Sequence, residues 1–150
     1  MKTFDTLYEL AACAGQEILV TDWYTVTQQH IDQFADATGD HQWIHVDPAR
    51  AKAGPFGVPI AHGYLTLSLL PAFFARSLDV RNTRMGLNYG CNKVRFMAPV
   101  PVGSRLRMRA RLLEAAPIEG GRQTTWQCTL EREGSDKPVC VAEPVYRYYA

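Results

Sequence analysis

The segment from His62 to Arg76 constrains the fold most, because it is apolar on nearly every face. A helix without a polar face is buried rather than surface-lying. Pro71 is expected to kink or restart this helix, since proline lacks the amide hydrogen that a helix interior needs. The small polar residues Thr66 and Ser68 can bond to backbone carbonyls one turn earlier. The rest of the chain must therefore cover this helix.

The second half of the sequence offers that cover as strands. Arginine and apolar residues alternate from Arg105 to Leu112, so one face of this strand is expected to be exposed to solvent and the other to be buried. A long antiparallel sheet can curl around the helix, which makes the fold class α+β. Strands are expected at 87–91, 93–97, 104–114, 122–132 and 139–149, separated by turns rich in glycine and proline.

The first half reads as short helices and loops. A strand is expected over 16–22, followed by a helix that Thr27 caps and that runs to about Thr38. Gly39 stands where a left-handed C-terminal cap would stand. Asp47, as N-cap, and Pro48, at the first helical position, predict a short helix through Ala53. Residues 54–59 cannot continue that helix and are expected to form a loop.

Length and composition limit the remaining possibilities. The 150 residues predict one domain, 1–150, and the net charge of +1 predicts neither nucleic-acid binding nor a polybasic membrane anchor. The richest apolar stretch, Tyr64 to Phe74, is shorter than the roughly 20 residues of a membrane span. With no signal-peptide pattern at the N-terminus, we expect a cytoplasmic protein. The four cysteines form no Cys-x-x-Cys pair, which predicts free thiols and no metal site.

Asp40 and His45 are the strongest candidates for catalysis. They lie in one short loop between the cap Gly39 and the cap Asp47, and rigid flanking elements suit a well-positioned acid/base pair. A carboxylate and a neutral imidazole a few ångströms apart can hold one water, remove its proton and return a proton to carbon. The structural alternative is that Asp40 caps a turn and His45 packs.

His62-Gly63 opens the apolar helix. Unpaired amide groups and the positive end of the helix dipole point out of such a start, and glycine lets a ligand approach closely. A carbonyl oxygen that becomes an enolate would be stabilised there. The structural alternative is that Gly63 permits tight packing between helix and sheet, with His62 as its polar flank.

Three motifs in this order resemble the MaoC-like, (R)-specific enoyl-CoA hydratases. They are Ala37-Thr38-Gly39-Asp40-x-x-x-Ile44-His45, Ala61-His62-Gly63, and Asn88 to Gly103. The resemblance covers residues 20 to 147 and implies a hot-dog fold, a long helix wrapped by an antiparallel sheet, which normally forms a homodimer. It also implies that Asp40 and His45 hold the water and that the Gly63 region polarises a thioester carbonyl.

One departure from the family is Gln42-Trp43, where the family usually has Asn-Pro. This version resembles the branch that includes nodulation protein N. Gln42 can still bond to a neighbouring backbone group, which keeps the loop shape, and we include it among the substrate-binding candidates. Trp43 is bulkier and can narrow the pocket or pack at a dimer interface.

The expected reaction is hydration of a trans-2-enoyl thioester to a 3-hydroxyacyl thioester, reversible as a dehydratase. No metal or redox cofactor is needed, and coenzyme A or pantetheine enters only as part of the substrate. His62, Lys93 and Arg95 are further substrate-binding candidates. Lys93 and Arg95 suit coenzyme A phosphates, although a solvated strand face explains them equally well.

Two other functions remain open at this point. Hot-dog thioesterases share the fold, but their acid often lies on the central helix, and Gly63 to Ala75 contains no Asp or Glu. A non-catalytic acyl-thioester-binding subunit would be free to lose the pair, whereas this chain retains both Asp40 and His45.

Overall fold

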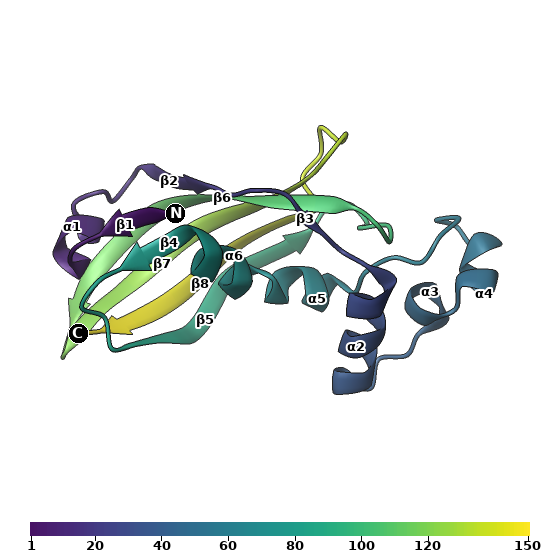
Figure 1. Cartoon of the computed structure of the whole chain (residues 1–150), viewed down its shortest axis with the longest axis horizontal. Helices are drawn as coiled ribbons and strands as arrows, with labels where there is room; N and C mark the ends of the chain where they lie inside the picture. The colour runs from purple at the N-terminus through teal and green to yellow at the C-terminus, as the bar shows by residue number, and fades with distance from the viewer.

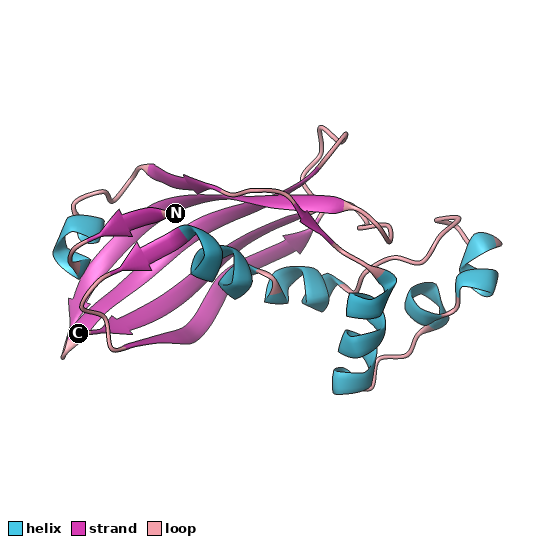
Figure 2. Cartoon of the chain, viewed as in Figure 1, coloured by secondary structure: helices cyan, strands magenta, loops and turns pink.

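The computed structural model describes residues 1–150 and confirms the α+β hot-dog class, with one long antiparallel sheet and a central helical segment against it (Figures 1 and 2). The strands are β1 (Lys2–Phe4), β2 (Glu17–Val20), β3 (Tyr24–Thr25), β4 (Leu78–Val80), β5 (Met85–Phe96), β6 (Arg105–Ile118), β7 (Gly121–Arg132) and β8 (Cys140–Tyr149). The helices are α1 (Leu7–Ala11), α2 (Gln28–Thr38), α3 (Trp43–Val46), α4 (Pro48–Lys52), α5 (Gly63–Ser68) and α6 (Leu70–Ser77).

The main sheet has six strands in the order β2-β6-β7-β8-β5, with β3 also paired to β6. The register places Met108 of β6 opposite Leu130 of β7, and Leu112 opposite Trp126. All four side chains are fully buried, because alternate residues of these strands face the helical side. This face of the sheet is the floor of the hydrophobic core.

The central helix is interrupted after Ser68 and restarts as α6, with Pro71 in its first turn, as expected. Phe74 packs edge-on against Trp126 at 4.9 Å, which anchors α6 to the sheet. The prediction that this segment is buried on nearly every face is wrong for the isolated chain, since the side chain of Tyr64 is 71% exposed. The sheet covers one side of the helix only.

Several short elements escaped the sequence analysis: β1, α1, β3, β4 and α3. The two strands expected at 87–91 and 93–97 are one strand, β5, whose register shifts between Asn88 and Gly90 and again between Cys91 and Val94. A register irregularity disturbs the apolar alternation without ending the strand, which explains the apparent break.

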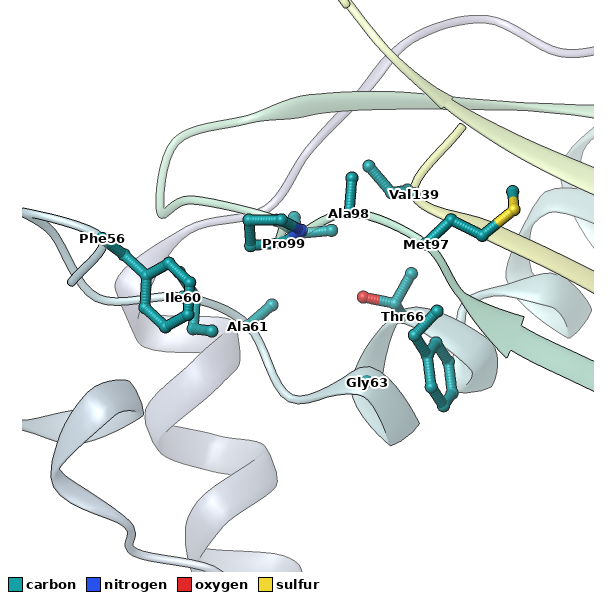
Figure 3. Close-up of a pocket in the computed structure, with 11 residues that line it drawn as sticks. Phe56, Ile60, Ala61, Gly63, Thr66, Met97, Ala98, Pro99 and Val139 are labelled. Atoms are coloured by element: carbon teal, nitrogen blue, oxygen red, sulfur yellow. The ribbon is translucent and has the colours of Figure 1, made fainter. Parts of the chain in front are cut away.

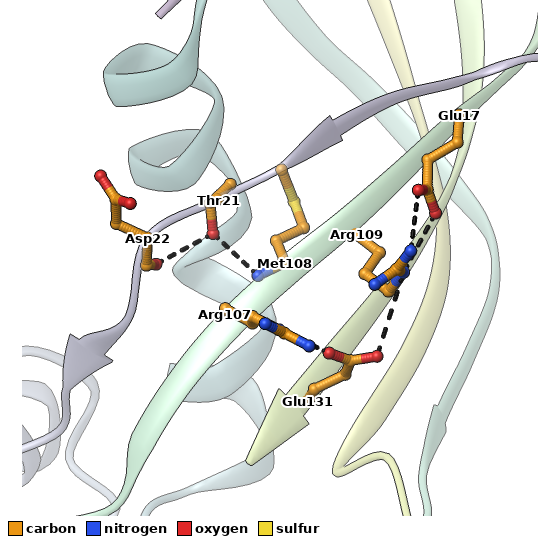
Figure 4. Close-up of polar contacts among 7 residues, drawn as sticks. All are labelled: Glu17, Thr21, Asp22, Arg107, Met108, Arg109 and Glu131. Atoms are coloured by element: carbon orange, nitrogen blue, oxygen red, sulfur yellow. Dashed lines mark hydrogen bonds and ion pairs between the residues drawn. The ribbon is translucent and has the colours of Figure 1, made fainter. Parts of the chain in front are cut away.

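The outer face of the sheet is wet, as the alternation in β6 predicted. Arg107 donates to Glu131 at 2.6 Å, and Arg109 makes two hydrogen bonds to Glu17 at 2.8 and 3.0 Å (Figure 4). Thr21 accepts a hydrogen bond from the Met108 amide at 2.9 Å and so ties the edge segment to β6. Arg105, Arg107 and Arg109 of β6 are therefore each paired with a glutamate.

Helices α2, α3 and α4 lie beyond one end of the sheet (Figure 1). Their predicted caps are present: Thr27 accepts from the His30 amide at 3.2 Å, Gly39 has φ 80°, and Asp47 accepts from the Arg50 amide at 2.9 Å. No helix in the structure has both the length and the apolar character needed to cross a membrane.

Candidate functional site

Asp40, His45 and His62 meet where the α2–α4 segment approaches the start of α5. One carboxylate oxygen of Asp40 and one ring nitrogen of each histidine all lie within 4.8 Å of one another. The structure thus brings the predicted pair together and adds His62 to it. It also corrects the position of His45, which lies on the short helix α3 rather than in an open loop.

His45 is held in one orientation. Its side chain is buried, and its Nδ1 lies 2.7 Å from the carbonyl oxygen of Ile60. A carbonyl can only accept, so Nδ1 carries the proton and Nε2 keeps its lone pair. His45 therefore offers a basic nitrogen to the site, fixed by a bond at the opposite side of the ring.

The surroundings keep this imidazole neutral. Burial is the main cause that lowers the pKa of His45 from its ordinary value of 6.5, because the charged form is poorly solvated there. The hydrogen bond to Ile60 raises the pKa, the neighbouring His62 lowers it, and Asp40 raises it. The net shift is downward, which suits a general base near neutral pH.

Asp40 is the solvent-facing member of the pair. Its residue is exposed, and its Oδ1 accepts one long hydrogen bond, 3.4 Å from the backbone amide of Gln42. The remaining acceptor capacity of the carboxylate is free for a water or a substrate group. A buried base next to an open carboxylate can hold one water between them.

His62 contacts both members of the pair. Its Nε2 lies 2.9 Å from the backbone carbonyl oxygen of Asp40, and its ring stacks on His45 with 3.8 Å between ring centroids. We expected His62 to bind substrate or to flank Gly63. The partners seen in the structure are protein groups, and a role in binding substrate stays a prediction.

Gly63 borders an apolar cavity of about 280 Å³ (Figure 3). A methyl group on Gly63 would lie 3.0 Å from the ring of Phe96, so the close approach that needs glycine is made by this ring. The amide of Gly63 makes no hydrogen bond within the chain. The cavity lining includes Phe56, Ile60, Ala61, Thr66, Met97, Pro99 and Val139.

Asp40, His45 and His62 are the residues that could hold a metal ion, and the expectation that none is needed stays a prediction. Zinc takes its ligands at about 2.0–2.2 Å in a tetrahedron, with each imidazole lone pair directed at the ion. The rings of His45 and His62 are stacked at 25° between their planes. Nδ1 of His45 and Nε2 of His62 face backbone carbonyl oxygens, so Nε2 of His45 and Nδ1 of His62 are the ring nitrogens left to bind a ligand.

The other predicted substrate-binding residues lie outside this cluster. Gln42 is exposed at the start of α3, Lys93 Nζ is 3.7 Å from Glu143, and Arg95 donates to the carbonyl of Val94 at 2.7 Å. Their role in binding substrate stays a prediction. Trp43 does not line the cavity beside Gly63.

Two contributors to the site carry no signal in the sequence. The Ile60 carbonyl fixes the His45 ring, and any residue type supplies a carbonyl. Gln28, the first residue of α2, donates its side-chain amide to the backbone carbonyl of His45 at 2.8 Å. A polar residue in the first turn of a helix is common, so nothing marked Gln28 in advance.

Comparison with known proteins shows what the chain is similar to. Residues 9–131 match the family model described as MaoC like domain. The 3-hydroxyacyl-thioester dehydratase Z of Mycobacterium tuberculosis (strain ATCC 25618 / H37Rv) is 53% identical over 151 residues, covering all of both chains. Nodulation protein N of Rhizobium leguminosarum bv. viciae is 48% identical over 141 residues, which cover 91% of this chain and 87% of that protein.

Solved structures share the fold at low sequence identity. The R-hydratase PhaJ1 from Pseudomonas aeruginosa in the unliganded form superposes with a TM-score of 0.72 at 24% identity, covering 91% of this chain and 81% of that chain. The (R)-hydratase from A. caviae involved in PHA biosynthesis gives a TM-score of 0.70 at 22% identity, covering 89% and 94%. The hot-dog architecture is therefore shared across these proteins.

Proposed function

Because the chain belongs to the MaoC-like dehydratase family, we propose that it catalyses the reversible, (R)-specific hydration of trans-2-enoyl-CoA to 3-hydroxyacyl-CoA. The observation that carries the proposal is the buried His45, whose Nδ1 is bonded to the Ile60 carbonyl and one of whose ring nitrogens lies within 4.8 Å of a carboxylate oxygen of the exposed Asp40. The name of the Mycobacterium tuberculosis relative, a 3-hydroxyacyl-thioester dehydratase, supports the same reaction class.

In the proposed mechanism, Asp40 and His45 hold one water. His45 takes a proton from the water as its oxygen attacks C3 of the enoyl thioester, and the pair returns a proton to C2. Negative charge develops on the thioester oxygen during the attack, and the unbonded amide of Gly63 donates to it. Dehydration is the same path in reverse, and coenzyme A or pantetheine takes part only as the carrier of the acyl group.

The apolar cavity next to Gly63 is the proposed site for the acyl chain. Its lining is mostly hydrophobic, and it includes Ile60, whose carbonyl is bonded to His45, and Ala61 and Gly63, the neighbours of His62 in the chain. Apolar cavities with a few polar groups at one end are typical small-molecule sites. Phe96 and Met97 bring the end of β5 into this wall.

We include a homodimer in the proposal. The strand β5 is at the edge of the sheet and is exposed along nearly its whole length. Met85, Leu87 and Tyr89 are 47%, 46% and 59% exposed there. An open edge that carries large apolar side chains supports pairing with a second copy, since such edges are otherwise prone to non-specific association.

The test is a hydration assay that follows loss of the enoyl absorbance with crotonyl-CoA, together with chiral analysis of the 3-hydroxyacyl product. We expect turnover to the (R) product, and Asp40→Asn or His45→Gln to lower kcat by roughly 10²- to 10⁴-fold. Variants that hydrate at the wild-type rate would contradict the proposal. Release of free thiol, detected with a thiol reagent, would indicate a thioesterase instead, and tight binding without turnover would indicate a non-catalytic acyl-binding subunit.

A further inference from the structure

The segment Ile60–His62 contacts both members of the catalytic pair. The carbonyl of Ile60 accepts the Nδ1 proton of His45, and two residues later the His62 ring bonds to the backbone of Asp40. Ala61, between them, donates its amide to the carbonyl of Val100 at 2.8 Å. This short segment is bonded to Val100 through Ala61, and it contacts residue 40 and residue 45 through two different groups.

For Asp40 the bond from His62 is the link to the rest of the fold. The carboxylate of Asp40 interacts only with the nearby Gln42 amide, at 3.4 Å, and Gly39 bonds only within its own helix end. His62 comes from 22 residues further along the chain, and its Nε2 reaches the Asp40 carbonyl at 2.9 Å. This hydrogen bond joins the backbone of residue 40 to a distant element, and that backbone carries the carboxylate.

The His62 side chain is itself firmly placed. It is 3% exposed, and its ring contacts two others: it stacks on His45 with 3.8 Å between centroids and is tilted against Phe34 at 4.9 Å. Its backbone carbonyl accepts from both the amide and the hydroxyl of Thr66, at 3.1 and 3.3 Å. A buried ring that packs against two other rings and whose backbone is hydrogen-bonded can hold its neighbours in place.

The hydrogen-bond pattern also fixes the tautomer of His62. Its Nε2 faces a carbonyl oxygen and must donate, so Nε2 carries the proton. Its Nδ1 is buried and has no hydrogen-bond partner. This is the opposite tautomer to that of His45, whose Nδ1 carries the proton.

From these contacts we infer that His62 is a positioning residue, which holds the Asp40 loop at the start of α5 and supports the face of the His45 ring. The inference rests on the proposed hydration reaction. This role differs from substrate binding, because the Nε2–H of the ring already donates to the Asp40 carbonyl and the ring stacks on His45. Displacement of a catalytic group by about 1 Å can cost on the order of 10²-fold in rate.

Two variants separate the two contacts. His62→Phe keeps an aromatic ring against His45 and Phe34 but removes the donor to Asp40. His62→Gln places an amide donor at a similar reach and removes the stack. His41→Gln is the matched control, because His41 is an exposed histidine of the same loop, paired with Asp36 at 2.9 Å.

We expect His62→Phe to lower kcat about tenfold to a hundredfold with KM for crotonyl-CoA within twofold of wild type. His62→Gln should recover part of that loss, and His41→Gln should stay within twofold of wild type. A raised KM with unchanged kcat would overturn the inference in favour of a substrate contact. So would a His62→Phe enzyme with the wild-type kcat, or a His62→Gln enzyme no better than His62→Phe.

A second set of measurements does not depend on activity, and its first part needs only the wild type. Nitrogen-15 NMR of the wild-type imidazoles should show the proton of His62 on Nε2 and that of His45 on Nδ1. In folded His62→Phe, amide hydrogen exchange should become faster at residues 40–42 and stay unchanged in β7. A His62 ring protonated on Nδ1 in the wild type would overturn the inference. Should the wild type fail to hydrate any enoyl-CoA while these signals appear as expected, the proposed function fails and the structural role of His62 stands.

Discussion

His45 donates its Nδ1 proton to the carbonyl of Ile60 across 2.7 Å, which leaves the lone pair of Nε2 free for the proposed role of base. Burial lowers the pKa of His45 below 6.5. The base works only when neutral, so kcat/KM should be level above its pKa and fall as the pH drops through it. We expect the acid limb of a kcat/KM profile to have its midpoint below pH 6.5.

The neighbouring His41 supplies the contrast for this profile. Its pKa is raised above 6.5, chiefly by the hydrogen bond to Asp36. A midpoint above 6.5 that disappears in His41→Gln would therefore assign the limb to His41 and contradict the role given to His45.

Asp40 and His45 should behave as one unit. If they hold a single water, removal of either group releases it, and removal of the second adds little. We expect the Asp40→Asn/His45→Gln double variant to lose no more than about tenfold in kcat beyond the worse single variant, measured on crotonyl-CoA. Losses that multiply would show that the two residues act on separate steps.

Asp40 and His45 could be singled out from the sequence because the helix caps around them are local sequence signals. Thr27, Gly39 and Asp47 are caps that mark where helices start and stop, and these marks place residues 40–46 between two helix ends. The helix α3 escaped detection because it spans four residues, too few for an apolar repeat.

The relationships that arise from tertiary contact could not be predicted in the same way. His62 is 22 residues from Asp40 and bonds to its backbone carbonyl, a group that every residue has. The exposure of one side of α5 could not be predicted either, because the sequence of an all-apolar helix does not tell whether the sheet or a second copy of the chain covers that side. Tyr64, at 71% exposure, is the residue that shows the difference.

The exposed edge strand β5 predicts a homodimer. One charged side chain introduced on this strand should disrupt it. Leu87 is 46% exposed on this edge strand, and burial of an unpaired carboxylate there would oppose association. Sedimentation should give twice the 16.8 kDa chain mass for the wild type and a shift towards the monomer for Leu87→Asp. A wild-type monomer at micromolar concentration with full hydratase activity would contradict the dimer.

Gly54 and Trp43 give a test of how α3 is supported. A methyl group on Gly54 would lie 2.8 Å from the Trp43 ring and 3.3 Å from the carbonyl oxygen of Ala51, so the ring must move. Such overpacking typically costs about 1–3 kcal/mol. Because Trp43 begins the helix that carries His45, we expect Gly54→Ala to lower both the free energy of unfolding in urea and kcat.

The smaller side chain in Trp43→Leu should accommodate the methyl group. In a double-mutant cycle, Gly54→Ala should therefore cost at least about 1 kcal/mol less in the Trp43→Leu background than in the wild type. Equal costs in the two backgrounds would show that the Ala51 carbonyl, rather than the Trp43 ring, requires glycine at position 54. In that case kcat should be insensitive to Gly54→Ala, because the backbone of α4 would absorb the strain without moving α3.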